Sequence, residues 1–195
     1  MKIIIILVLF FNLNTYGKYF EGKVVLKNNT EKNGLIELGK NLTLNFKVDK
    51  KSEKEVIKGE DIKYVLTIDN KYNQNKYEFH LTSTKGLVGN KEKMRLLKII
   101  VEGNINLYVA SEGLSYSTGG SGVSTFSTST YFLKRLEETK PTFFVAFGYV
   151  VKQDFKTFIK EYFKDCNELI TKVNKNELKE KHSIEIASFY NNNCK

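Results

Sequence analysis

The chain has 195 residues and a formal net charge of +9, from 31 Lys and Arg residues against 22 Asp and Glu residues. Only Arg95 and Arg135 are arginines, and arginine is the residue best suited to bidentate contacts with phosphates and bases. The composition therefore argues against sequence-specific nucleic-acid binding and favours a solvated basic surface, with a polyanion site as the alternative. A chain of this size usually forms one domain.

The first 17 residues have the layout of a secretory signal peptide. Met1-Lys2 precedes an apolar run, Ile3–Phe11, and small residues stand at Thr15 and Gly17. The run would cover about 14 Å as a helix, which is too short for a bilayer core of about 30 Å. We expect cleavage after Gly17, export to the periplasm or the extracellular space, and no transmembrane segment in the mature chain. The alternative is a buried N-terminal strand.

From Tyr19 to about residue 148, apolar and polar residues alternate with the period of a β-strand. Strands with one dry and one wet face are typical of antiparallel sheets. The apolar residues of the three clearest strands are Leu42, Leu44, Phe46 and Val48; Ile62, Tyr64, Leu66 and Ile68; and Tyr77, Phe79 and Leu81. The segment 96–102 is apolar on both faces, so we expect it at the centre of the sheet.

Two dipeptides predict hairpin turns. Asn33-Gly34 suits a type I′ turn, because both residues tolerate a positive φ. Gly103-Asn104 suits a type II′ turn between strands 96–102 and 105–110.

Two polar stretches are expected to interrupt the sheet. Residues 49–60 are dense in Lys and Glu and predict an exposed loop. Residues 111–129 are rich in Ser, Thr and Gly and predict a long loop, which is uncommon unless functional or disordered. This loop either covers a binding surface or is a simple hairpin connection.

After Gln153 the apolar spacing becomes helical. Asp154 is a candidate N-cap, and an apolar stripe extends from Phe155 to Val173. It predicts one long helix, or two helices that meet near Cys166-Asn167, docked on the sheet. A last helix is expected to start near Ser183.

Cys166 and Cys194 are the two cysteines of the chain. An even number in an exported chain favours a disulfide. The bond would close a loop of about 29 residues and contribute about 3.5 kcal/mol on the chain-entropy model. The alternative is a pair of free buried thiols, whereas the spacing fits neither a metal site nor a redox motif.

No catalytic, cofactor or metal residue is assigned, and we expect a non-enzymatic protein without a cofactor. His80 and His182 have no second histidine at zinc-ligand spacing, and both are predicted to lie on the surface. No nucleophile elbow is present. Candidate carboxylates such as Glu78 and Glu102 lie among lysines, which is typical of a solvated surface.

Four aromatic residues in predicted turns or loops are the candidate binding residues. Tyr72 and Tyr77 flank a predicted turn, and Tyr116 and Phe126 lie in the Ser- and Gly-rich loop. Exposed aromatic residues on loops often anchor partners or sugars.

The segments FIKEYFKDCNEL, at 158–169, and SIEIASFYNNNC, at 183–194, resemble the tail of an uncharacterised family of exported Bacteroidetes proteins. That family shows a Tyr-Phe-x-Asp-Cys-Pro-x-Leu pattern and a later Tyr-Asn pair, with Asn167 standing here in place of the proline. Residues 21–38 and 97–108 resemble its hairpins. The resemblance implies an exported β-rich domain with a helical tail and a structural cysteine, and it implies no activity.

These features predict an α+β protein. A curved antiparallel sheet, or a partly closed barrel or roll, is expected over residues 18–152, with two or three helices over 153–195 packed on the same domain. We expect a non-enzymatic envelope or secreted module that binds an envelope protein, a glycan or a surface. One alternative is a carrier of an apolar ligand held between the sheet and helix 155–163. The other is a carboxylate-dependent hydrolase.

Overall fold

The computed structural model describes residues 19–38, 42–69, 73–83, 92–118, 122–147 and 154–194. The predicted signal peptide lies outside these ranges. Within them, ten strands are followed by three α-helices. The strands are β1 (Phe20–Leu26), β2 (Glu31–Leu38), β3 (Thr43–Lys47), β4 (Glu55–Lys58), β5 (Ile62–Asp69), β6 (Asn73–Ser83), β7 (Glu92–Val101), β8 (Ile105–Thr118), β9 (Gly122–Arg135) and β10 (Thr142–Phe147). The helices are α1 (Phe155–Tyr162), α2 (Asn167–Asn174) and α3 (Ser183–Asn193).

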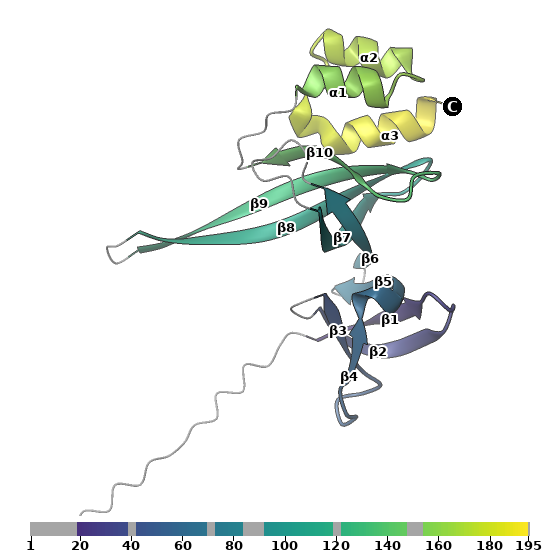
Figure 1. Cartoon of the computed structure of the whole chain (residues 1–195), viewed down its shortest axis with the longest axis vertical. Coiled ribbons are helices and arrows are strands. Elements are labelled where there is room, and N and C mark those ends of the chain that lie inside the picture. The colour runs from purple at the N-terminus through teal and green to yellow at the C-terminus, as the bar shows by residue number, and fades with distance from the viewer. Residues whose placement is uncertain are drawn as a thin grey trace, which may run out of the picture.

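All ten strands belong to one open antiparallel sheet, in the order β10-β9-β8-β7-β6-β5-β1-β2-β3-β4. The helices lie together at the β10 end, while β1–β4 lie at the opposite end of the molecule (Figure 1). This arrangement confirms the α+β class with a curved sheet and C-terminal helices. Strand β7, apolar on both faces, lies between β6 and β8 as its sequence predicts.

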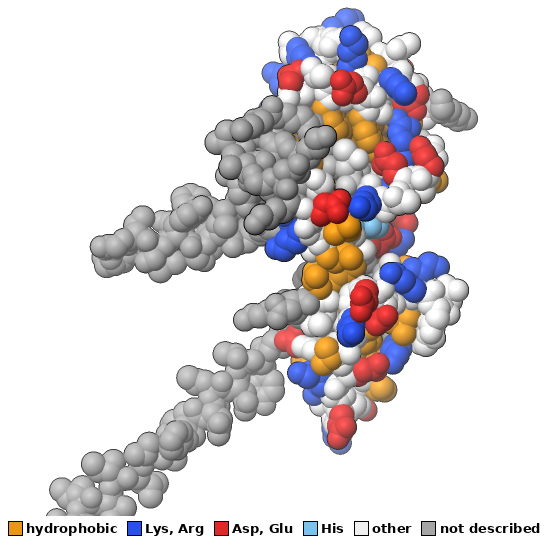
Figure 2. Space-filling view, in the orientation of Figure 1, with side chains coloured by type: hydrophobic (Ala, Val, Ile, Leu, Met, Phe, Trp, Pro, Cys, Tyr) orange, Lys and Arg blue, Asp and Glu red, His pale blue; other side chains and the backbone are white. Residues whose placement is uncertain are grey.

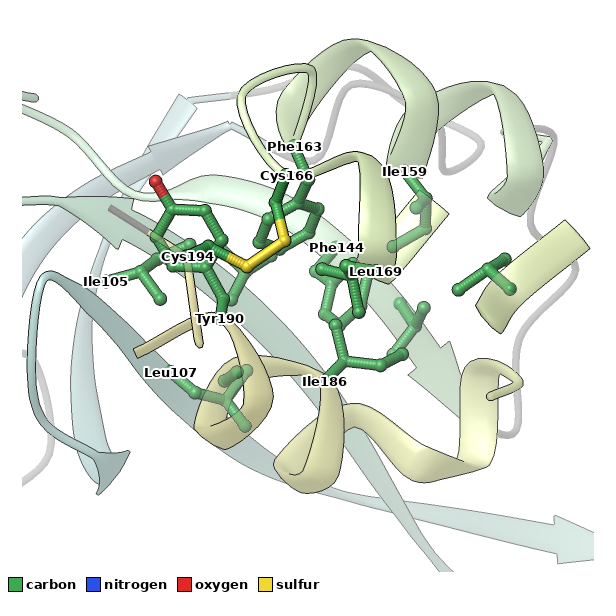
Figure 3. Close-up of a cluster of buried hydrophobic side chains, with 14 residues drawn as sticks. Ile105, Leu107, Phe144, Ile159, Phe163, Cys166, Leu169, Ile186, Tyr190 and Cys194 are labelled. Carbon is green, nitrogen blue, oxygen red and sulfur yellow. A yellow bond between two sulfur atoms is a disulfide. The ribbon is translucent and has the colours of Figure 1, made fainter. Parts of the chain in front are cut away.

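The sheet holds separate hydrophobic clusters at its two ends. At the β1–β5 end, the cluster contains Val24, Ile36, Leu44 and Val65, which are fully buried. At the other end, the helices cover one face of the sheet and enclose a larger cluster, drawn in Figure 3. A smaller cluster of Leu97, Tyr108, Ala110, Phe132 and Phe143 is buried separately.

Both hairpin predictions need correction. The β1–β2 turn lies at Asn28-Asn29, where Asn29 adopts a φ of 64° and the Asn28 side chain accepts a hydrogen bond from the Thr30 N–H. Gly34 instead lies within β2, opposite Gly22 of β1, and a Cβ there would come 2.2 Å from the carbonyl oxygen of Lys47. Gly103 does lie between β7 and β8, but it lacks the positive φ that a type II′ turn requires.

The predicted apolar face of residues 62–68 is correct only at Ile62, which is buried. Val65 and Thr67 are buried, whereas Ile68 is exposed. The cause is a β-bulge. Val25 pairs with Tyr64 but Leu26 pairs with Ile62, so one extra residue shifts the alternation along β5.

The prediction for 42–48 is correct only at its centre. Leu44 and Phe46 are buried in β3, but Leu42 and Val48 lie beyond the strand and are exposed.

The two predicted loops contain strands. The backbone of residues 111–118 continues β8 and pairs with β9 as far as Thr118 and Gly122. Residues 55–58 form β4, whose Ile57 is buried against Leu44 of β3. In β4, pairing and the buried Ile57 outweigh the low strand propensity of Glu and Lys. In residues 111–118, pairing with β9 supports the strand.

Of the two alternatives for the segment before Ser183, the structure confirms two helices rather than one long helix. Asp154 caps α1 by accepting a hydrogen bond of 2.9 Å from the Thr157 N–H. Helix α1 ends at Tyr162, and α2 begins at Asn167. Cys166 forms a disulfide with Cys194, which follows α3.

A side chain of α3 also joins that helix to the sheet. The Asn191 amide accepts a hydrogen bond from the Ile105 N–H and donates one to the Ile105 carbonyl oxygen, both at 2.9 Å. One side chain thus satisfies both backbone groups of a residue at the start of β8.

Candidate functional site

A pocket of about 690 Å³ opens between α1 and the start of β10. Its volume is within the range of about 300–1,000 Å³ that is typical of ligand sites. Its lining consists of Ser83, Lys140, Pro141, Thr142, Phe143, Asp154, Thr157, Phe158, Glu161 and Tyr162. A second pocket of about 550 Å³, beside β1, β2 and β5, has no aromatic ring among its described lining residues. The pocket beside α1 is therefore the better candidate for a binding site.

Aromatic rings form the wall of this pocket on the helix side. Phe158 and Tyr162 stand one turn apart on α1, and their rings stack with centroids 5.1 Å apart. Phe158 also contacts Phe144 of β10, with centroids 5.4 Å apart. Because Phe144 belongs to the buried cluster, this contact ties the wall to the core.

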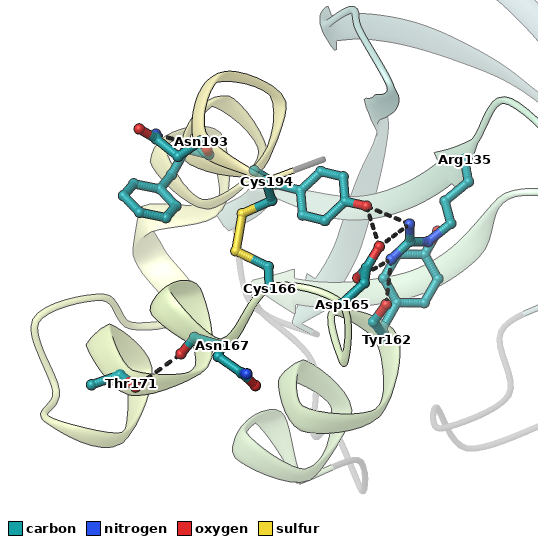
Figure 4. The surroundings of a disulfide bond; sticks show 10 residues. Arg135, Tyr162, Asp165, Cys166, Asn167, Thr171, Asn193 and Cys194 are labelled. Atoms are coloured by element: carbon teal, nitrogen blue, oxygen red, sulfur yellow. Dashed lines mark hydrogen bonds and ion pairs between the residues drawn. A yellow bond between two sulfur atoms is a disulfide. The ribbon is translucent and has the colours of Figure 1, made fainter.

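Arg135, at the end of β9, fixes the position of α1 (Figure 4). Its two terminal nitrogens donate to the two oxygens of Asp165, at 2.9 and 2.8 Å. One of them also donates to the Tyr162 carbonyl oxygen, at 2.7 Å. The guanidinium lies between the rings of Tyr162 and Tyr190. These contacts and the adjacent disulfide secure the break between α1 and α2 against the sheet.

This arrangement sets the protonation of the groups behind the pocket wall. The hydrogen bonds from Arg135 lower the pKa of Asp165 from 3.8 to about 2. Burial and a hydrogen bond to Glu138 raise the pKa of Tyr162. The Tyr162 hydroxyl therefore stays protonated at neutral pH and donates to Glu138 at 2.8 Å.

The described residues at the rim of the pocket carry more negative than positive groups. Asp154 and Glu161 contribute two carboxylates. Hydrogen bonds from Thr157 lower the pKa of Asp154, which is ionised at neutral pH. Lys140 adds a positive charge, but its Nζ lies 3.1 Å from a carboxylate oxygen of Glu92. Elsewhere the two signs of charge are interspersed over the face seen in Figure 2.

His80 is not a surface residue, which corrects the sequence-based prediction. Its side chain is only 15% exposed. Its Nε2 lies 2.7 Å from Glu78 Oε2, and the same oxygen accepts a hydrogen bond from the Tyr108 hydroxyl at 3.0 Å. Asn106 donates to that hydroxyl. Burial alone would raise the pKa of Glu78, but the hydrogen bonds from His80 and Tyr108 lower it below its usual value.

This polar cluster lines none of the pockets described above, so we interpret it as a structural network. Burial raises the pKa of Tyr108, which is fully enclosed. The polar-face alternation of β6 indicated solvent for Glu78 and His80. The sequence alone does not reveal that Tyr108 of β8 faces them.

The four candidate aromatic residues do not gather at the pocket. Tyr77 lies within β6, paired with Val65 and Lys98, and packs half-buried on the β1–β5 cluster. The predicted turn after Tyr72 is wrong, because β6 already begins at Asn73. Tyr116 and Phe126 belong to strands β8 and β9 rather than to a loop, and their side chains lie outside the described part of the structure. Tyr72 itself also lies outside the described residues.

The sequence predicts a purely structural role for the pocket residues Phe158 and Tyr162, as part of the apolar stripe from Phe155 to Val173. Within residues 155–163 of that stripe, Ile159 and Phe163 are fully buried, while Phe155, Phe158 and Tyr162 are half-buried. A signal was present in the width of the stripe. These five residues span about 140° of the helix, with the three half-buried rings on one side of the arc and Ile159 and Phe163 on the other.

Among the described residues, no helix has the length and apolar character needed to cross a membrane. In the same ranges, His, Cys, Asp and Glu side chains form no group of three or more that could hold a metal ion. Comparisons with protein-family models, characterised proteins and solved structures gave no match. The resemblance to the exported Bacteroidetes family therefore stays a prediction.

Proposed function

We propose that this protein is an exported, non-enzymatic binding module, and that it holds part of its partner in the pocket beside α1. The observation that carries the proposal is an open pocket of about 690 Å³ whose aromatic wall is anchored from behind. A rigid aromatic wall binds with little loss of conformational entropy, because the rings are already ordered.

Export is supported by the signal-like N-terminus and by the cysteine pair. A disulfide between Cys166 and Cys194 is compatible with an oxidising compartment. The bond lies beside the Arg135 contacts that hold α1, so it contributes to the rigidity of the pocket wall.

The carrier of an apolar ligand remains the second candidate, and the position of the pocket favours it. The pocket lies between the sheet and the predicted ligand-holding helix. However, the space directly under α1 is filled by Phe144, Ile159 and Phe163. A ligand would therefore bind at the edge of the helix–sheet interface rather than be enclosed within it.

The acidic residues of the pocket favour binding over glycoside hydrolysis. Asp154 is the N-cap of α1, a structural role that holds its carboxylate on the backbone of the first turn. In addition, one oxygen of Asp154 is occupied by capping hydrogen bonds from Thr157.

A fragment screen by NMR tests the proposal. A panel of small apolar and amphipathic fragments is titrated into isotopically labelled protein, and we expect saturable shifts of backbone amides in residues 154–162. A Thr142→Trp variant should block the pocket, because Thr142 lines it and is exposed. Thr171→Trp, at an exposed position on α2, is the matched control. If no fragment saturates these amides, or if Thr142→Trp binds as the parent does, the proposed site is wrong.

A further inference from the structure

We infer that the group held in the pocket beside α1 is an organic cation on an apolar stem, such as an alkyl- or arylammonium or the side chain of a lysine or arginine. This inference rests on the proposed function and adds the chemistry of the ligand. Two properties of the lining carry it: its aromatic rings and its carboxylates.

The aromatic rings suit both parts of such a ligand. Phe158 and Tyr162, which are half-buried, offer apolar area for the stem. The negative face of an aromatic ring attracts ammonium and guanidinium groups, whereas its edge is positive. The chain already uses this chemistry beside the pocket, because Arg135 lies 5.4 Å from the ring centroid of Tyr162.

The charged groups at the rim favour a ligand of positive charge. Asp154 and Glu161 are both exposed carboxylates on the pocket side of α1. The nearby cation, Lys140, is paired with Glu92, so the four groups carry one positive and three negative charges. Among the described residues around the pocket, this excess of negative charge stands out in a chain with a net charge of +9.

The lysines of α1 do not offset the negative charge of the carboxylates at the rim. Lys156 and Lys160 fall on the opposite side of the helix from the lining residues, as expected from helical periodicity. The Nζ of Lys156 lies 3.5 Å from the Asn174 carbonyl oxygen, toward α2. An anionic ligand would meet the carboxylates at the rim without a free cation among the described lining residues to compensate.

Three ligands of the same shape test the inference: 4-phenylbutylammonium, 4-phenylbutanol and 4-phenylbutyrate. We expect the amine to bind at the amides of residues 154–162 about tenfold more tightly than the alcohol, and the carboxylate to bind most weakly. Glu161→Gln should remove most of the difference between amine and alcohol. Glu168→Gln, an equally exposed change on α2, should leave it intact. Added salt should narrow the difference, because the carboxylates at the rim are exposed.

A second pair of ligands distinguishes a free amine from a partner's side chain. The peptide amide acetyl-Phe-Arg is compared with its neutral citrulline counterpart. In either case the arginine peptide should bind more tightly than the citrulline peptide, which supports a cation site. If the arginine peptide also binds more tightly than the phenylbutyl amine, the ligand is the side chain of a protein partner. If the amine binds more tightly, the ligand is a small amine. Equal affinities for amine and alcohol would overturn the cation inference while leaving the binding function in place. Absence of binding by every ligand, together with a failed fragment screen, would overturn both.

Discussion

Arg135 and Asp165 form a two-pronged ion pair that joins the end of β9 to the break between α1 and α2, 30 residues later in the chain. The Arg135 side chain is 18% exposed and that of Asp165 is 39% exposed. The pair is therefore partly shielded from water, and its loss should be measurable.

Replacement of Asp165 by Asn should lower the free energy of unfolding by about 1 to 3 kcal/mol, because Arg135 keeps its charge and loses its carboxylate. Asp61→Asn, at an exposed position in the turn before β5, should change it little. Urea unfolding of the three proteins checks this, and equal stability would show that solvent replaces the ion pair.

The same ion pair predicts that the protein loses stability as the pH falls. Because the pKa of Asp165 is lowered from 3.8 to about 2, the stabilisation is complete above pH 4 and is lost as the pH falls toward 2. Unfolding curves between pH 5 and pH 2 should therefore show a smaller acid-induced loss for Asp165→Asn than for the parent.

The disulfide should contribute about 3.5 kcal/mol to stability by restricting the unfolded chain. Mass analysis of the exported protein should detect two hydrogens gained on reduction. A double Cys166→Ala, Cys194→Ala variant should unfold at a lower denaturant concentration than the oxidised protein, and should match the reduced protein within about 1 kcal/mol. An unchanged midpoint would exclude a stabilising role.

Gly34→Ala should be severely destabilising, with a loss of 2 kcal/mol or more, on the order expected for overpacking. The added methyl group would meet the Lys47 carbonyl oxygen, which belongs to a paired strand and cannot move alone. The exposed neighbour Asn33→Ala provides the control. Thermal unfolding followed by circular dichroism measures both, and a stable Gly34→Ala protein would mean that β2 and β3 separate at this point.

Tyr108→Phe should cost about 1 to 3 kcal/mol, because it removes the hydroxyl that links Asn106 to Glu78 in a buried position. Tyr131→Phe, on the neighbouring strand β9, is a matched change at a half-buried tyrosine. Chemical denaturation distinguishes them. If both variants lose equally little free energy of unfolding, water replaces the Tyr108 hydroxyl as a partner of Glu78.

N-terminal sequencing of exported protein should read Lys18 as its first residue. A chain that retains Met1 in the exported fraction would refute cleavage after Gly17. Detection of the protein only inside the cell would refute export itself.

The sequence predicted the class of the fold well, because the change from period two to helical spacing near Gln153 is a local property. It failed where the outcome depends on pairing between distant strands. The bulge beside Ile62 reversed the buried face of β5, and the polar residues after Ala110 form a strand because β9 pairs with them.

The pocket was less predictable than the fold. The sequence places Phe158 and Tyr162 in an apolar stripe, but their half-exposure depends on where Pro141, just before β10, and Phe143 of β10 lie. In the same way, the partner of Arg135 cannot be read from its neighbours in the chain, since Asp165 comes from a different element.

The position of Cys194 after α3 has a consequence for the order in which the molecule assembles. The strands and α1 are all synthesised before this cysteine. The covalent link to Cys166 can therefore form only after every wall of the pocket has emerged, and closure of the helical layer is a late event. Any oxidant that the protein meets before then acts on a lone Cys166, which is free to pair with another thiol.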